Sequence, residues 1–315
     1  MSALRLFAFD YASGADELPD SLRHQGRMML RALLADLGEV PGIELITMGQ
    51  PGSFRRRFNA GLQAADAVWP LAPEAGGMLE RLSRQVLLSD RILLGSKPDA
   101  LRVAGSKLRT SRALARAGVA VAATYSPGQP LPPGSGAWVV MPDDGAGCLE
   151  TRIFPGAKAA LAWVAASGTA GYVLQPFIPG KLCSLSLLCR DGAAQVLGCN
   201  EQRIAVRDNQ FHFLGTTVNS MADADGGFDR LAQAVAAAIP GLWGHVGVDF
   251  VMAERGPVVM EVNARMTTSY AGLHASIGCN PAALVLDLLG QPAGTPRARA
   301  KPVAVSVDVA AFGSA

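Results

Sequence analysis

The stretch Glu261-Val262-Asn263-Ala264-Arg265, read with Asp249 twelve residues before it, decides the fold of this chain. Two apolar runs that are typical of strands, 246–252 and 258–264, surround the short loop Glu254-Arg255-Gly256. Glycine suits the last position of a three-residue hairpin loop, because it adopts the left-handed conformation without steric cost. The sequence therefore predicts a β-hairpin.

The register of this hairpin determines which side chains share a face. Pairing Ala253 with Pro257 places Asp249 directly opposite Glu261. Since side chains alternate along a strand, the asparagine and the arginine at the end of the quoted stretch lie on that same face. The other face is expected to enter a core, because its members are apolar: Val246, Val248, Phe250, Met252, Val258, Met260, Val262 and Ala264.

The polar face has the composition of a magnesium site. Carboxylate and amide oxygens are the ligands that Mg²⁺ prefers, so Asp249, Glu261 and Asn263 are the candidate metal ligands. Arg265 is the candidate catalytic residue, because a guanidinium offsets the charge of a transferring phosphoryl group. The alternative is a half-buried hairpin with a solvated polar face, which is common in antiparallel sheets. We favour the metal site.

Length and composition indicate a globular chain of about two domains rather than a disordered one. Half of the 315 residues are apolar, 17% are charged, and the formal net charge of +2 comes without a basic block. These features disfavour nucleic acid and anionic membranes as partners. The N-terminus does not resemble a signal peptide, and no apolar run reaches the ~18–20 residues of a membrane span. Five scattered cysteines fit reduced thiols in a cytoplasmic protein.

Strands and helices are expected to alternate in the first hundred residues, which indicates a parallel α/β sheet. The expected strands are 4–9, 43–48, 67–71 and 91–94, and the expected helices run from Asp20 or Ser21 to 37 and over 74–85. We assign residues 1–103 to an N-terminal α/β lobe.

Two α+β lobes are expected to follow. In the first, residues 104–179, a helix capped by Ser106 precedes strands at 119–124, 138–141 and 172–177 and a helix at 156–166. In the second, residues 180–315, strands at 184–189, 195–199 and 211–214 precede the hairpin, with helices at 228–239 and 281–289 and a last strand at 302–312.

Three further features are candidates for binding a nucleotide. The loop 143–147 contains Gly145 and Gly147, whose backbone can approach phosphates closely, although an ordinary surface turn looks the same. The segment between the two α+β lobes can offer main-chain groups to a base and apolar walls around it, or it can be a buried connector; its candidates are Gln175, Phe177 and Ile178. Lys107, in the first turn of a helix, can reach a phosphate or be simply solvated.

The order of these features resembles the ATP-grasp superfamily over residues 104–290. The resemblance implies two α+β lobes that hold ATP with Mg²⁺ (or Mn²⁺) between them. It also implies that Asp249, Glu261 and Asn263 bind the metal. Most members of the superfamily join a carboxylate to an amine through an acyl phosphate, in agreement with phosphoryl transfer stabilised by Mg²⁺.

A narrower resemblance covers nearly the whole chain. Four segments look like the tyramine–glutamate ligase family of methanofuran biosynthesis: Phe9-Asp10-Tyr11-Ala12-Ser13-Gly14, residues 28–36, Ala72-Pro73-Glu74 and residues 263–273. This resemblance implies that ATP activates glutamate and that an aromatic amine, tyramine or tyrosine, attacks it. Thr267-Thr268-Ser269-Tyr270 would then help to line the acceptor or phosphoryl end of the site, although its hydroxyl groups also suit a helix start.

The chain departs from the superfamily pattern at three positions. Met141 stands where a phosphate-binding lysine is usual, and Lys181 or Arg152 are the candidate substitutes. Leu182 stands near the usual ribose-binding acid, and Ala264 replaces a proline. Three hypotheses follow: an active glutamate–amine ligase, which we favour, a non-catalytic nucleotide-binding protein or partner subunit, and an ATP-dependent ligase with other substrates.

Overall fold

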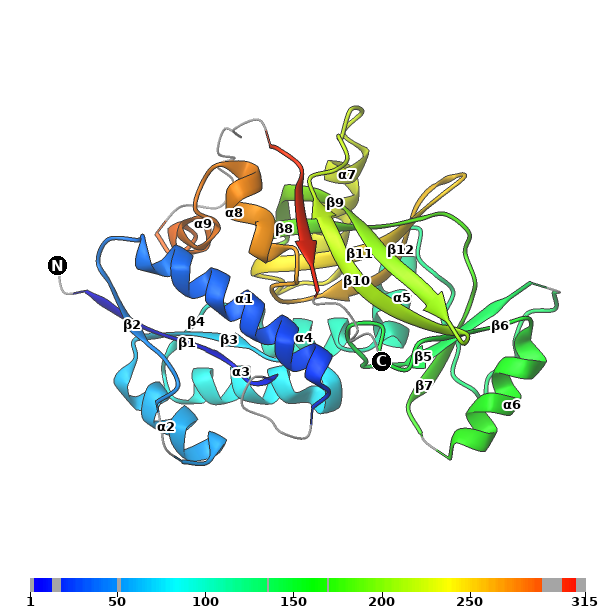
Figure 1. The fold of residues 1–315 in the computed structure, drawn as a ribbon, viewed down its shortest axis with the longest axis horizontal. Coiled ribbons are helices and arrows are strands. Elements are labelled where there is room, and N and C mark those ends of the chain that lie inside the picture. Colours follow the sequence, from blue (N-terminus) through cyan, green and yellow to red (C-terminus); the bar gives the residue numbers. More distant parts are fainter. Residues whose placement is uncertain are drawn as a thin grey trace.

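The computed structural model describes residues 3–12, 18–49, 52–134, 136–168, 170–290 and 302–309. Within these ranges the strands form two sheets, one of four strands and one of nine (Figure 1). The two sheets belong to different parts of the chain. Residues up to Leu93 supply the first sheet, and residues from Trp138 onward supply the second.

The N-terminal lobe is a parallel sheet in the order β2-β1-β3-β4, as the alternating pattern predicts. Leu6 and Ala8 of β1 pack in the core under α1, whereas Phe7 and Phe9 pack in the core with α2 and α3, so helices cover both faces. The elements are β1 (Leu4–Asp10), α1 (Asp20–Gly38), β2 (Ile43–Ile46), α2 (Phe54–Ala64), β3 (Ala67–Leu71), η2 (Ala75–Gly77), α3 (Met78–Leu88), β4 (Ile92–Leu93) and α4 (Pro98–Ala104).

The second sheet is antiparallel, in the order β12-β11-β8-β9-β10-β6-β5-β7, with β13 paired to β10. Its strands are β5 (Trp138–Pro142), β6 (Arg152–Phe154), β7 (Tyr172–Pro176), β8 (Lys181–Arg190), β9 (Ala193–Arg207), β10 (Gln210–Val218), β11 (Gly244–Ala253), β12 (Gly256–Asn263) and β13 (Val305–Asp308). The helices are α5 (Lys107–Arg116), α6 (Ala157–Ser167), α7 (Gly227–Ala238), α8 (Tyr270–Ile277) and α9 (Pro281–Asp287).

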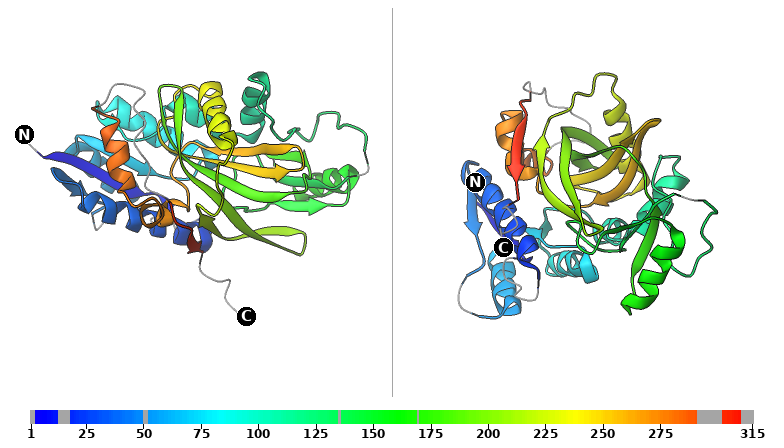
Figure 2. Two further views of the ribbon diagram at one scale, coloured as in Figure 1. Left: turned by 90° about the horizontal axis from the view of Figure 1, so that it is seen from above. Right: turned by 45° about the vertical axis from the view of Figure 1, so that its right-hand side comes forward.

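The second sheet has a small part and a large part. Strands β5 to β7 lie with α6 at one end of the molecule, away from the N-terminal lobe (Figures 1 and 2). Among the described residues, strands β6 and β10 join this part to the rest of the sheet, with Arg152 paired to Gln210. The architecture is therefore an α/β lobe followed by antiparallel α+β structure, as the sequence predicts.

Several predicted elements have different bounds in the structure, and the following differences are the clearest. The helix expected from Glu74 begins at Met78, because Gly76 and Gly77 adopt positive φ angles of 60° and 67° that interrupt it. The strand expected at 119–124 forms only isolated bridges, at Val121 and Tyr125. The last strand covers Val305–Asp308, and residues 310–312 of the prediction lie outside the described residues. No helix in the described ranges is long and apolar enough to cross a membrane.

The β11–β12 hairpin has a tighter loop than predicted. Ala253 pairs with Gly256 rather than with Pro257, so the loop contains only Glu254 and Arg255. Gly256 adopts a φ of +113°, a conformation that side-chain-bearing residues rarely adopt. The predicted register near the loop is therefore wrong by one residue.

A β-bulge corrects this shift before the polar residues are reached. Glu261 lies opposite Asp249, as predicted, whereas Val259 lies opposite Phe250, which makes Met260 the extra residue. The bulge also changes which residues face the core. Val259 is fully buried, while Met252, Val258 and Met260, which were expected in the core, are only partly buried.

Candidate active site

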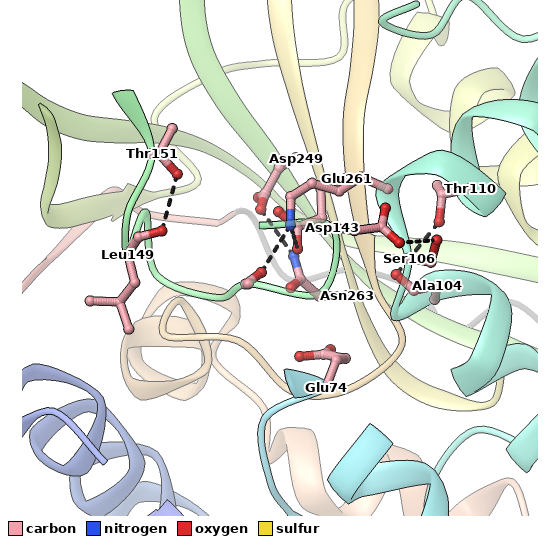
Figure 3. A network of polar contacts seen from close by, with 12 residues as sticks. Glu74, Ala104, Ser106, Thr110, Asp143, Leu149, Thr151, Asp249, Glu261 and Asn263 are labelled. Carbon is pink, nitrogen blue, oxygen red and sulfur yellow. Dashed lines mark hydrogen bonds and ion pairs between the residues drawn. The ribbon is translucent and has the colours of Figure 1, made fainter. Parts of the chain in front are cut away.

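The polar side chains of the hairpin converge near the C-terminal end of β12. The amide of Asn263 donates to Oδ2 of Asp249 over 2.9 Å, and the amide of Gln202 donates to Oδ1 over 2.8 Å. Figure 3 shows Asp249, Glu261 and Asn263 close together beside these two strands. Because Asn263 uses its nitrogen to hold Asp249, its amide oxygen remains available as a ligand. Gln202 on β9 is a site residue that the sequence analysis missed.

The electrostatics of the two carboxylates suit a cation. Burial and, to a smaller extent, the nearby charge of Glu261 raise the pKa of Asp249 to about 7, against the hydrogen bond from Asn263. Burial also raises the pKa of Glu261, against the field of Lys107. A divalent cation would relieve the mutual repulsion of these groups. In the described part of the chain, no group of three or more His, Cys, Asp or Glu side chains is arranged so that it could hold a metal ion. A metal at this hairpin would therefore need the amide oxygen of Asn263 as well as the two carboxylates.

Lys107 belongs to this site and is not solvated. It opens α5 behind Ser106, whose hydroxyl accepts from the third amide of the helix as an N-cap. Its Nζ donates to the carbonyl of Gly145 over 2.9 Å and to Oε1 of Glu261 over 3.3 Å. The side chain is buried, so its charge acts on Glu261 through little solvent. The glycine loop and the hairpin thus meet at one ammonium group.

The glycine loop is held by the residues that begin it. The carboxylate of Asp143 accepts from the amide of Leu108 and from the hydroxyl of Ser106, at 2.9 and 2.6 Å. The carboxylate of Asp144 accepts from the amide of Gly76 over 2.7 Å. An acidic side chain at the start of a helix is electrostatically favourable. The loop is therefore tied both to α5 and to the N-terminal lobe.

Arg265 also reaches across to the N-terminal lobe. Its Nη2 lies 2.8 Å from Oε2 of Glu74, and its Nη1 donates to the carbonyl of Met266 over 3.1 Å. Burial acts to lower the pKa of Arg265, but the carboxylate of Glu74 and the fields of Glu261 and Asp249 outweigh it and raise the pKa. The guanidinium is permanently charged. Glu74 is a second residue for which the sequence analysis predicted no role.

A cavity of about 150 Å³ lies beside these groups. Its polar lining includes the hairpin residues and Arg265, and residues of α1 also line it. Its lining includes Leu22, Gln25, Gly26, Met29, Gly147, Cys148, Gln202, Phe213, Asp249, Glu261, Asn263, Arg265, Thr267, Thr268 and Ser269. Burial raises the pKa of the Cys148 thiol to about 12, with the charges of Asp249 and Glu261 adding to the effect, so the thiol stays protonated and is a poor nucleophile.

The segment after Arg265 divides between this cavity and the core. Thr267, Thr268 and Ser269 line the cavity. Tyr270 does not, because its hydroxyl donates to the buried carboxylate of Asp36 on α1 over 2.6 Å. Of the four residues in this segment, the first three thus line the cavity and the fourth connects two lobes.

The candidate base-binding residues do not line the cavity; Gln175 is on β7, and Phe177 and Ile178 lie between β7 and β8. The amide of Gln175 donates to Oγ1 of Thr124 over 2.9 Å, and its buried Oε1 has no hydrogen-bond partner among the described residues. Phe177 is 41% exposed and Ile178 is partly buried. The ammonium group of Lys107 connects the glycine loop to the hairpin, because it contacts both Gly145 and Glu261.

Met141 lies in an apolar cluster and its proposed substitutes are engaged elsewhere. The cluster contains Val139, Met141 and Val173, with Leu108, Ile153 and Phe211 packed against it. Lys181 pairs with Glu201 at 2.8 Å, and the guanidinium of Arg152 lies 5.5 Å from the centre of the Trp163 ring. Leu182, near the usual ribose-binding position, is partly buried. Lys107 is therefore the lysine that meets the hairpin in this structure.

An α/β lobe in front of an antiparallel sheet, with a carboxylate–amide hairpin facing a glycine loop, defines the ATP-grasp class. The ATP-grasp domain model matches residues 104–269, just over half of the chain, and the pre ATP-grasp 3 domain model matches residues 28–101. The chain belongs to the ATP-grasp family, and it is a family member of the ligase type.

Individual relatives are distant. The chain is 24% identical to the tyramine–L-glutamate ligase of Methanocaldococcus jannaschii over 286 residues, which are 84% of this chain and 83% of that protein. The crystal structure of an ATP-grasp superfamily protein from Archaeoglobus fulgidus matches with a TM-score of 0.73 at 23% identity, over 97% and 99% of the two chains. The D-alanine–D-alanine ligase of Bacillus anthracis matches with a TM-score of 0.66 at 13% identity, over 91% and 96%. These structures show the fold.

Proposed function

We propose that the protein is an ATP- and Mg²⁺-dependent carboxylate–amine ligase that joins glutamate to tyramine or tyrosine in the biosynthesis of a methanofuran-type cofactor. The observation that carries the ligase chemistry is the convergence of Asp249, Glu261 and Asn263 beside two buried cations. The choice of glutamate and an aromatic amine rests on the resemblance to the tyramine–glutamate ligases.

The hairpin residues would hold the metal. Two carboxylates, one amide oxygen and the phosphates of a nucleotide form the kind of ligand set that Mg²⁺ uses. When bound, Mg²⁺ neutralises charge on the transferring phosphoryl group. The cations of the chain add to this effect, with Lys107 on the side of the glycine loop and Arg265 on the side of the cavity. In the reaction the glutamate carboxylate takes the terminal phosphoryl group of ATP, and the amine then displaces phosphate to form the amide.

The nucleotide would lie along the glycine loop toward the segment between β7 and β8. The backbone of Gly145 and Gly147 would face its phosphates, because glycine permits close approach of the main chain. Gln175, Phe177 and Ile178 would surround the base. The unsatisfied Oε1 of Gln175 supports this assignment, since a buried acceptor without a donor is uncommon.

The acceptor amine would occupy the side of the cavity formed by α1. Leu22 and Met29, on one face of this helix, line the cavity together with Phe213 on β10. A cavity of ~150 Å³ with apolar walls is on the scale that accommodates one aromatic ring. Thr267, Thr268 and Arg265 line the same cavity, where they would contact polar groups of the substrates.

Turnover tests the proposal directly. Purified protein with Mg-ATP, glutamate and either tyramine or tyrosine should release ADP and phosphate and form a γ-glutamyl amide. Asp249→Asn should abolish this turnover, and the exposed Asp229→Asn on α7 is the matched control. Turnover without amide formation would contradict the ligase assignment, and an active Asp249→Asn protein would contradict the metal assignment.

Met141 favours a second candidate, a nucleotide-binding protein that does not catalyse ligation. Its neighbours in the cluster are apolar, so none of them offers a lysine at this position an opposite charge. Under the ligase proposal, Met141→Lys buries an uncompensated ammonium group and lowers both stability and turnover, whereas Met141→Leu is tolerated. A large gain in turnover for Met141→Lys would instead favour the second candidate.

A further inference from the structure

Glu74 and Arg265 form a buried ion pair between residues 191 positions apart. Nη2 and Nε of Arg265 lie 2.8 and 2.9 Å from the same oxygen of Glu74, Oε2. The side chains are only 7% and 15% exposed, so this pair is shielded from solvent screening. Removal of either partner would leave a buried charge.

The geometry of this pair is not the one expected of a purely structural anchor. An arginine and a carboxylate that serve only to hold each other typically make two parallel hydrogen bonds, one to each oxygen. Here Oε1 of Glu74 is buried and has no hydrogen-bond partner among the described residues. An unsatisfied buried carboxylate oxygen opposes folding. Stability alone therefore does not account for the arrangement.

The backbone around Glu74 keeps its side chain in place. The carbonyl of Glu74 accepts from the amide of Gly77 over 2.8 Å, and the amide of Gly76 donates to Asp144. Gly105 packs beside Glu74, and a Cβ at this position would come within 2.9 Å of the carbonyl oxygen of Leu101. Figure 3 shows Glu74 on this segment, facing the hairpin residues. The carboxylate is thus presented to the hairpin by the N-terminal lobe.

The position of Glu74 matters because of what else Arg265 can contact. The other carboxylates whose charges act on Arg265 are Glu261 and Asp249, which are on the same hairpin. A buried guanidinium that lost its partner would turn to the nearest carboxylates. Those carboxylates are the candidate metal ligands, and a guanidinium on them would compete with a cation.

We propose that Glu74 is a positioning residue that holds Arg265 away from Asp249 and Glu261, so that the metal and the guanidinium occupy separate places beside the phosphoryl groups. This inference rests on the proposed function, because it assumes that the hairpin binds a divalent cation. It assigns a role in metal binding to a residue of the N-terminal lobe that contacts no metal ligand in the described hydrogen bonds and ion pairs.

Metal binding measures this role without the need for turnover. Mn²⁺ is titrated into the full-length protein in the presence of ADP, and free Mn²⁺ is followed by its paramagnetic resonance signal. Glu74→Ala should weaken Mn²⁺ binding by about tenfold or more, the effect that loss of an outer-shell partner typically has on a metal site. Glu74→Gln keeps the shape of the side chain and removes its charge, so it should weaken Mn²⁺ binding less than Glu74→Ala does. It also serves as the second variant if Glu74→Ala does not fold.

A double substitution separates positioning from general damage to the fold. If Arg265 occupies the metal ligands in Glu74→Ala, then Glu74→Ala/Arg265→Met should bind Mn²⁺ about as well as the natural protein. A purely structural defect would not be rescued by a second substitution at a contact residue. Glu80→Gln is the matched control, because it removes one carboxylate from a partly exposed pair with Arg84 nearby in the chain.

Two results would overturn the inference: unchanged Mn²⁺ binding in both Glu74 variants, or a double variant that binds as weakly as Glu74→Ala. Asp249→Asn distinguishes these results from failure of the proposed function. If Asp249→Asn binds Mn²⁺ like the natural protein, the metal assignment itself is wrong. If Asp249→Asn loses binding while the Glu74 variants do not, only the role of Glu74 is wrong.

Discussion

The ammonium group of Lys107 lies 3.3 Å from Oε1 of Glu261, although 154 residues separate them in the chain. This contact and the pair of Arg265 with Glu74 place two cations among three carboxylates, the third being Asp249. The ionised site carries an excess of one negative charge. A divalent cation would reverse the excess to one positive charge, which suits a site for phosphates.

Replacement of Lys107 by methionine should therefore impair the use of ATP. The substitution removes the charge that faces Glu261 and the donor to the carbonyl of Gly145. We expect kcat/KM for ATP to fall by about 10²-fold, the scale of losing one preorganised charge-stabilising donor. Steady-state kinetics with Lys158→Met, an exposed lysine on α6, as the control would measure this. Equal kinetics in both variants would show that Lys107 serves only to hold the loop.

The raised pKa of Asp249 predicts how Mg²⁺ binding depends on pH. Burial, followed by the charge of Glu261, raises this pKa to about 7. A metal requires the ionised carboxylate, so protons compete with Mg²⁺ below pH 7. The apparent affinity for Mg²⁺ in the presence of ADP should fall by roughly tenfold for each pH unit well below 7. Titration calorimetry between pH 6 and pH 8 measures this dependence.

The same shift has a consequence for the metal-free protein. Because the folded-state pKa is raised above the unfolded value, protonation of Asp249 favours the folded state. The contribution of Asp249 to the free energy of unfolding should thus decrease as the pH rises from about 4 to about 7. Asp249→Asn removes this contribution, so its pH–stability profile should be flatter than that of the natural protein. Parallel profiles in chemical denaturation would contradict the assigned pKa.

Local pattern predicted the part of the site that lies on one hairpin. The alternation of polar and apolar residues around Glu261 is enough to bring it opposite Asp249, and this pairing survives an error in the loop. The bulge at Met260 could not be predicted, because the residues around it are all compatible with an unbroken strand. The helix that follows its N-cap residue Ser106 was also predicted from local sequence.

Contacts between lobes could not be predicted from local sequence pattern. Glu74 and Gln202 reach the site from other lobes or strands, and no spacing in the sequence relates them to Arg265 or Asp249. The burial of Lys107 depends on how the glycine loop docks, which no local pattern predicts. The family resemblance included Glu74 within a short motif, but the pairing of Glu74 with Arg265 could be found only from the structure.

Loss of the Tyr270 hydroxyl should lower stability without affecting catalysis. Asp36 on α1 is buried and accepts from Tyr270 and from Nδ1 of His274, both at 2.6 Å. Tyr270→Phe leaves a buried carboxylate with one donor fewer, so the free energy of unfolding should fall by about 1–3 kcal/mol. Urea denaturation measures it, with Tyr125→Phe, whose ring packs on Trp138, as the control. A normal stability combined with lost turnover would instead place Tyr270 in the reaction.

The apolar wall of the cavity should determine the choice of amine. Leu22 lies on α1 at the cavity, so Leu22→Ala enlarges the space proposed for the aromatic ring and removes contacts with it. We expect the KM for tyramine or tyrosine to rise by roughly tenfold, the effect of about 1.4 kcal/mol of lost apolar contact, while the KM values for ATP and glutamate stay within twofold. Arg27→Ala, an exposed position on the same helix, is the control and should change none of the three constants. A rise in the KM for glutamate alone would mean that the acid and not the amine lies against α1, and the two substrates would then have to be exchanged in the proposed arrangement.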